Sequence, residues 1–225
     1  MPLDDTNALD KIEVDERLKN ILGINAVLTT GLSADVVHVI NNSLEQIFNE
    51  YPQLKGIVQQ FNITKDTKAA MAEFKVSYKN GVFRTLLTFN INDMNNIDII
   101  TKIINDHVIE GIWTTKNGLN GVIRHEMAHV WEFLYTCVKY GINFTDTCVN
   151  GMIKREKVAR AYAMHEIANK IVKQALKNLG MSNNEWEYLS EYASEGIEEA
   201  FAEALSDSSE NALSNEIKRI VKMEY

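Results

Sequence analysis

His125-Glu126-Met127-Ala128-His129 lies near the middle of this 225-residue chain and is its most informative segment. Apolar residues recur around it at helical spacing, which predicts a helix from residue 119 to residue 140. Two histidines four residues apart on a helix project from one face, and both imidazoles can reach one ion at about 2.0–2.1 Å. The segment therefore predicts a metal centre in which His125 and His129 are ligands.

Glu126 follows the first histidine directly, so its side chain projects about 100° away around the helix axis. It is poorly placed to be a third ligand beside the histidines, but it can reach a water on the open side of the metal. Zinc lowers the pKa of such a water towards about 7, and a carboxylate can take its proton. We therefore predict zinc as the cofactor and Glu126 as a general base, the pattern typical of zinc metallopeptidases.

A catalytic zinc centre needs a third protein ligand. In metzincins the histidine helix continues to a glycine and a third histidine, but this chain has Glu132 and Tyr135 at those two positions, which excludes that class. The other large class takes a glutamate from a later helix. Residues 195–207 offer several carboxylates for this purpose.

Two registers of the later helix remain open from spacing alone. In the first, Glu199 is the ligand and Glu203, one turn further on, orients a ligating histidine. In the second, Glu203 is the ligand and Asp207 takes the supporting position. Both place two carboxylates on one helix face with apolar neighbours such as Phe201.

Residues 199–205, Glu-Ala-Phe-Ala-Glu-Ala-Leu, with Tyr192 seven residues upstream, resemble the third-ligand helix of gluzincins of the anthrax lethal factor type. Clostridial Pro-Pro endopeptidases are similar there. The resemblance implies that Glu199 binds zinc, Glu203 supports the site and Tyr192 stabilises the oxyanion. The second register, from Glu203 to Asp207, resembles instead the ligand segment of thermolysin.

A wider resemblance begins at about residue 33 and runs through a helix end at 44–56, a strand at 87–90 and a tryptophan-containing loop. This order resembles the metallopeptidase domain of phage minor head proteins. It implies a zincin-like (gluzincin) domain over residues 31–225, after an N-terminal extension at residues 1–30. It also suggests the strand Val82–Asn90 as an edge strand that could pair with an extended peptide substrate.

The hydrophobic pattern predicts an α+β fold that is mainly helical, with a small mixed sheet. Asn80-Gly81 is a strong signal for a two-residue hairpin turn between two strands. The predicted strands are 73–80 and 82–91, and the predicted helices are 10–22, 34–51, 96–109, 119–140, 153–179, 195–205 and 212–223.

Composition limits the partners of the chain. The formal net charge of −8 argues against nucleic acid as a partner. No stretch approaches the roughly 18 apolar residues of a membrane span, and the polar N-terminus does not resemble a signal peptide. We expect a cytoplasmic or phage-particle-associated protein that acts on a peptide or protein.

Two alternatives come from other classes. A di-iron carboxylate bundle needs two ExxH segments, and this chain has one, from Glu126 to His129. A structural or toxin-associated component of a phage or mobile element could keep a zincin-like fold without peptidase activity. His165 is a further, weaker possibility as a second donor to the oxyanion.

Overall fold

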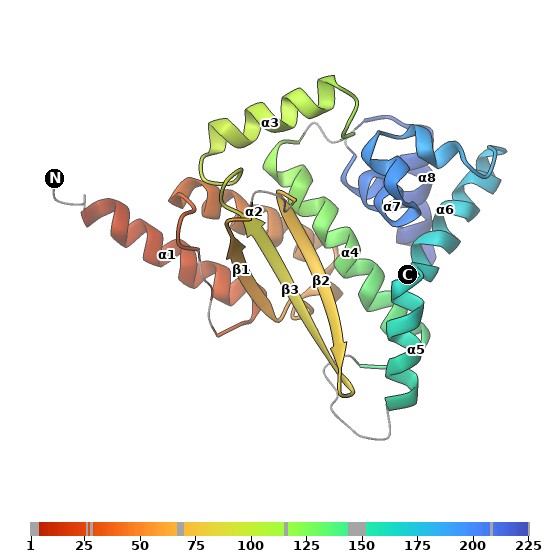
Figure 1. Cartoon of the computed structure of the whole chain (residues 1–225), viewed down its shortest axis with the longest axis horizontal. Helices are drawn as coiled ribbons and strands as arrows, with labels where there is room; N and C mark the ends of the chain where they lie inside the picture. The colour runs from red at the N-terminus through yellow and green to blue at the C-terminus, as the bar shows by residue number, and fades with distance from the viewer. Residues whose placement is uncertain are drawn as a thin grey trace.

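The computed structural model describes most of the chain as one α+β unit (Figure 1). The predicted fold class, mainly helical with a small mixed sheet, is confirmed. The described residues are 5–25, 27, 29–66, 70–114, 117–143, 152–207 and 209–224.

The sheet has three strands in the order β1-β3-β2. Strand β1 is parallel to β3, and β2 is antiparallel to it. Side chains alternate across the sheet, and one face carries the buried residues Phe61, Phe74, Phe83, Leu87 and Phe89. The strands are β1 Gln60–Thr64, β2 Ala72–Lys79 and β3 Val82–Asn90.

The hairpin between β2 and β3 turns at the predicted dipeptide. Asn80 and Gly81 both have positive φ, at 53° and 79°, which a two-residue turn of this kind requires. Lys79 pairs with Val82 across the turn. The hairpin was therefore predicted correctly from its turn chemistry.

The expectation that Val82–Asn90 is an edge strand is wrong. This strand, β3, lies in the centre of the sheet, because β1 pairs with its other side. The hairpin signal is local, whereas β1 pairs with β3 from more than twenty residues away in the chain. The edge strand nearest the histidine helix is β2.

Helix α4 contains both histidines and lies between the sheet and the C-terminal helices (Figure 1). It contacts β2 and α2 on one side and α7 on the other. Ser33 caps α2 by accepting a hydrogen bond from the backbone nitrogen of Val36. The N-terminal helices are α1 Asp5–Leu22, α2 Ala34–Glu50, α3 Ile97–Ile109 and α4 Leu119–Lys139.

The predicted long helix over residues 153–179 is instead two helices, α5 Met152–Ala163 and α6 Glu166–Leu179. The chain breaks at His165, which has a left-handed backbone with φ 48°. Neither glycine nor proline marks this break, so the local pattern does not show it. The last two helices, α7 Ile197–Ser206 and α8 Ala212–Glu224, match their predicted positions closely.

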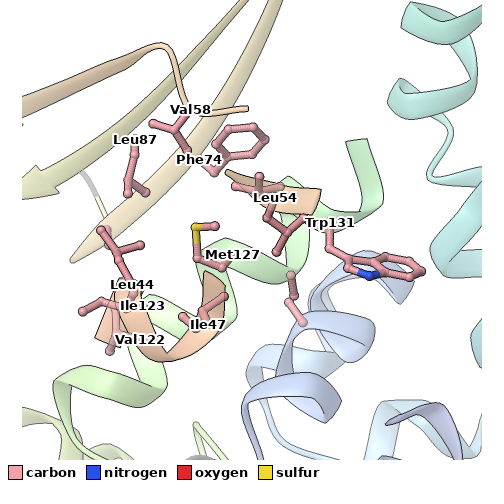
Figure 2. Packing of buried hydrophobic residues seen from close by; sticks show 14 of the residues in the cluster. Leu44, Ile47, Leu54, Val58, Phe74, Leu87, Val122, Ile123, Met127 and Trp131 are labelled. Atoms are coloured by element: carbon pink, nitrogen blue, oxygen red, sulfur yellow. The ribbon is translucent and has the colours of Figure 1, made fainter. Parts of the chain in front are cut away.

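The core joins the sheet to the helices through α4. Figure 2 shows Met127 of this helix between Leu87 and Phe74 of the sheet and Leu44 and Ile47 of α2. The α1 residues Leu18 and Leu22 belong to the same core and are fully buried. No helix in the described part of the chain is long and apolar enough to cross a membrane.

Candidate metal centre

His125 and His129 lie one turn apart on α4, and both are buried. Their ring centroids are 5.1 Å apart. Both Nε2 atoms face the same carboxylate oxygen, Oε2 of Glu199, at 3.0 Å from His125 and 3.6 Å from His129. The two histidines therefore converge on one point, as i, i+4 spacing predicts.

Glu199 comes from the first turn of α7, which packs against α4. The rings of Trp131 on α4 and Phe201 on α7 lie 5.6 Å apart. Small buried residues on α7, Ala200 and Ala204 among them, help the two helices approach closely. Packing of these helices brings together residues that are seventy or more positions apart in the chain.

His125, His129 and Glu199 form a group that could hold a metal ion. One potential ligand atom from each residue lies within 4.8 Å of the other two. Tetrahedral zinc with ligands at about 2.0–2.1 Å holds neighbouring ligand atoms roughly 3.3 Å apart. The observed distances of 3.0 and 3.6 Å lie on either side of that value. Two imidazoles and one carboxylate also form a donor set that suits zinc.

Glu203 lies behind His125, on the side away from Glu199. Its Oε1 is 3.3 Å from His125 Nδ1, and its side chain is 2% exposed. Its Oε2 accepts hydrogen bonds from the backbone nitrogen of Thr114 at 2.7 Å and from the Ser190 hydroxyl at 3.0 Å. Sequence reasoning missed Thr114 and Ser190, because both come from irregular segments far from the motif.

Glu126 lies on the open side of the histidines, beside the edge strand. Its Oε2 accepts a 2.7 Å hydrogen bond from the backbone nitrogen of Phe74. Burial raises the pKa of this carboxyl, although His125, His129 and the bond from Phe74 oppose the shift. A carboxyl with a raised pKa holds a proton more readily, which suits a group that accepts one and later donates it.

The charges of His125, Glu199 and the nearby carboxylates influence one another's pKa. Burial opposes a charge on His125, but the carboxylates of Glu199, Glu203 and Glu126 outweigh it and raise its pKa to about 10. Burial would raise the pKa of Glu199, yet His125 and His129 lower it well below its usual value.

Tyr192 begins the short 3₁₀ helix η4 Tyr192–Glu195, just before α7. Its ring lies 5.5 Å from the ring of His125. Burial and the nearby carboxylates of Glu199 and Glu126 raise the pKa of its hydroxyl. The hydroxyl therefore stays protonated at neutral pH and can donate a hydrogen bond.

His165 contacts a carboxylate that lies about one turn beyond His129 on α4. Its Nδ1 lies 3.1 Å from Oε2 of Glu132, a fully buried carboxylate on α4. Its Nε2 lies 3.8 Å from Oε1 of Glu198, the neighbour of Glu199. Sequence reasoning noticed His165 but gave it no partner.

Asp207, the supporting residue in the second register, does not join the metal group. Its carboxylate accepts hydrogen bonds from the backbone nitrogen and hydroxyl of Ser209, both at 2.7 Å. Glu203 lies beside Nδ1 of His125, whereas Glu199 lies beside Nε2. Among the described residues, the group that could hold a metal contains Glu199 and not Glu203.

Comparisons with known proteins assign no relationship. No family model matches the chain, and neither a curated protein nor a solved structure matches it. The site must therefore be interpreted from its own geometry.

Proposed function

We propose that this protein is a zinc-dependent endopeptidase of the gluzincin type. The observation that carries the proposal is the convergence of His125, His129 and Glu199 on one point, with Glu126 beside it. A structural metal site would use its donors to close the coordination sphere. Three protein donors with a buried carboxylate next to them are instead typical of a catalytic centre.

In this proposal His125, His129 and Glu199 hold the zinc ion, and Glu203 fixes the ring of His125 through Nδ1. Zinc bound there would supply Lewis acidity, which makes a water acidic and a carbonyl electrophilic. The resemblance to lethal factor-type gluzincins supports the same assignment of Glu199 and Glu203.

Glu126 carries out the proton transfers, and Tyr192 stabilises the charge that develops on the carbonyl oxygen. Glu126 accepts the proton of the attacking water through its carboxylate as the new C–O bond forms. The Tyr192 hydroxyl donates a hydrogen bond to the carbonyl oxygen as negative charge develops there. Glu126 then gives its proton to the amine nitrogen as the C–N bond breaks, so the carboxylate is regenerated.

The edge strand β2 supports a peptide as the substrate. It lies next to α4, and its Phe74 backbone reaches Glu126 directly. Extended peptides commonly add to exposed edge strands through main-chain hydrogen bonds. We therefore propose β2, and not β3, as the strand that would pair with an extended peptide, which would then lie close to Glu126.

The test combines metal analysis with a peptide library. We expect one zinc ion per chain and internal cleavage of peptides, with cleavage abolished by a chelator and restored by added zinc. Stoichiometric zinc without cleavage of any peptide would favour the alternative, a phage or mobile-element component with this fold and no peptidase activity. Absence of zinc binding would overturn both the metal site and the mechanism.

A further inference from the structure

A cavity of about 420 Å³ opens directly beside the candidate metal centre. His125, Glu126 and Tyr192 form one side of it, so it is continuous with the proposed reaction site. This volume falls within the range of about 300–1,000 Å³ that is usual for ligand pockets. The cavity is therefore large enough for a substrate side chain next to the bond that is cut.

The remaining walls of the cavity are mainly apolar. They come from the start of β2, from α3, from the segment after α3 and from α4, and include Met71, Ile103, Ile112, Trp113 and Val122. Asp93 and His107 are polar members of the lining. Such a lining favours apolar groups, because their burial removes nonpolar surface from water.

Segment 111–114, which contains Trp113, is hydrogen-bonded to Glu203 beside the candidate metal centre. The backbone nitrogen and the hydroxyl of Thr114 donate to Glu203 Oε2 at 2.7 and 3.0 Å. Glu203 Oε1 lies 3.3 Å from His125 Nδ1. One buried carboxylate therefore sets the position of a potential metal ligand and of the cavity wall together.

The same segment also forms backbone hydrogen bonds with Glu191 and Tyr192. The backbone nitrogen of Glu191 donates to Gly111 O, and that of Tyr192 donates to Ile112 O, both at 3.0 Å. The Ser190 hydroxyl donates to Glu203 as well. Segment 111–114, Tyr192 and His125 are thus joined by one set of contacts through Glu203 and the backbone.

We propose that this cavity selects a bulky apolar side chain, leucine or an aromatic residue, at a position flanking the scissile bond. The inference rests on the proposed peptidase function and names its substrate class. Segment 111–114 is the wall that determines specificity, and Glu203 is the positioning residue that keeps this wall in register with His125. A substrate with alanine at that position leaves the cavity unfilled and loses the binding energy of the apolar group.

The experiment measures kcat/KM of the zinc-loaded protein on peptides that differ only in one flanking residue, with Ala, Leu, Phe or Asp in turn. At one position we expect kcat/KM for the Leu and Phe peptides to exceed that for the Ala peptide by about 10–200-fold. This is the range that small apolar differences in a pocket produce. Ile103→Trp fills the cavity and should lower the Phe/Ala ratio at least about 10-fold. Ile109→Trp, at the exposed end of the same helix, is the matched control and should leave the ratio unchanged.

Thr114→Val separates wall positioning from metal binding, because it keeps the shape of the side chain and removes the hydroxyl that reaches Glu203. We expect zinc stoichiometry to be unchanged while the Phe/Ala ratio falls. A ratio that does not change in Ile103→Trp, or equal cleavage of Ala and Phe peptides at every position, overturns the cavity assignment and leaves the peptidase function standing.

If the protein cleaves no peptide, the proposed function is wrong, and the cavity is then tested by peptide binding alone. Glu126→Gln protein loaded with zinc is titrated with the Phe and Ala peptides in a calorimeter. The cavity assignment is supported if the Phe peptide binds more tightly than the Ala peptide and if Ile103→Trp abolishes this difference. Equal affinities for the two peptides overturn it.

Discussion

The backbone nitrogen of Phe74 donates a 2.7 Å hydrogen bond to Oε2 of Glu126. Phe74 lies in the edge strand β2, where alternate residues turn their backbone groups away from β3. Met71 O, at the start of the strand, accepts from Asn90 N and so faces β3, which places Phe74 on the outer side. The edge of the sheet therefore fixes the carboxylate that we propose as the general base.

This contact determines the best variant for testing Glu126. Glu126→Gln removes the base but keeps an oxygen that can accept the bond from Phe74. We expect hydrolysis to fall by at least about 10²–10⁴-fold, the usual contribution of general base catalysis. Zinc content and Tm should change little, as measured by elemental analysis and thermal denaturation.

Glu126→Ala serves as the comparison, since it leaves the buried N–H of Phe74 without its acceptor. The loss of this partner should cost about 1–3 kcal/mol of stability in addition to the loss of activity. Hydrolysis by Glu126→Gln at the rate of the parent protein would contradict the proposed role of Glu126.

Glu199 and Glu203 of α7 should have different effects on zinc affinity. Glu199→Ala removes a proposed ligand and should abolish stoichiometric binding in a competition titration with a zinc-sensitive dye. Glu203→Gln removes no proposed ligand but alters the support of His125, together with the contacts to Thr114 and Ser190, and should weaken binding about 10–100-fold. Glu198→Gln, a change of the neighbouring carboxylate, is the matched control and should bind zinc normally.

Asp207→Asn tests the second register of α7 directly. Its carboxylate is held by Ser209, so we expect zinc affinity to be unchanged. If Asp207→Asn weakened binding as much as Glu203→Gln, the assignment of the supporting residue would be wrong.

How much of the fold was predictable depends on how local each feature is. The turn at Asn80-Gly81 and the helix around His125 have local causes, and both were predicted. Strand β1 was not predicted as a strand, because Gln60–Thr64 is short and its partner β3 is distant in sequence. Strand order depends on such distant pairing, which explains why β3 was wrongly expected at the edge.

The candidate site was predictable in part for the same reason. Spacing identified His125 and His129, since both lie on one helix face. The approach of α7 to α4 is tertiary, so spacing alone left Glu199 and Glu203 as alternatives. The positions of Thr114 and Ser190 beside Glu203 depend on loops, for which the local pattern offers no signal.

Met127 should contribute strongly to stability, because it lies on α4 between the sheet and α2 (Figure 2). It is 2% exposed. Met127→Ala should lower the free energy of unfolding by about 2–5 kcal/mol in denaturant titrations. Met127→Leu, which nearly conserves volume, should cost less than about 1.5 kcal/mol. Equal stabilities of the Ala variant and the parent would show that this part of the core is not packed as described.

The pair of Glu132 and His165 should make stability depend on pH. Burial alone would lower the pKa of His165, but the hydrogen bond and charge of Glu132, with the charges of Glu198 and Glu199, raise it. A folded pKa above the unfolded value of about 6.5 means that protonation stabilises the folded protein. This stabilisation is complete below about pH 6.5 and is lost as pH rises through the folded pKa.

Glu132→Gln tests this coupling, because it removes the charge while keeping a side chain of similar shape against His165 and Ala168. Burial then has less opposition, so the pKa of His165 should fall and the stabilisation at low pH should shrink. The readouts are the NMR titration of His165 and Tm against pH, both measured in zinc-loaded protein. His165→Gln should remove the pH-dependent difference between the parent and Glu132→Gln. An unchanged His165 titration in Glu132→Gln would mean that the buried carboxylate does not control this histidine.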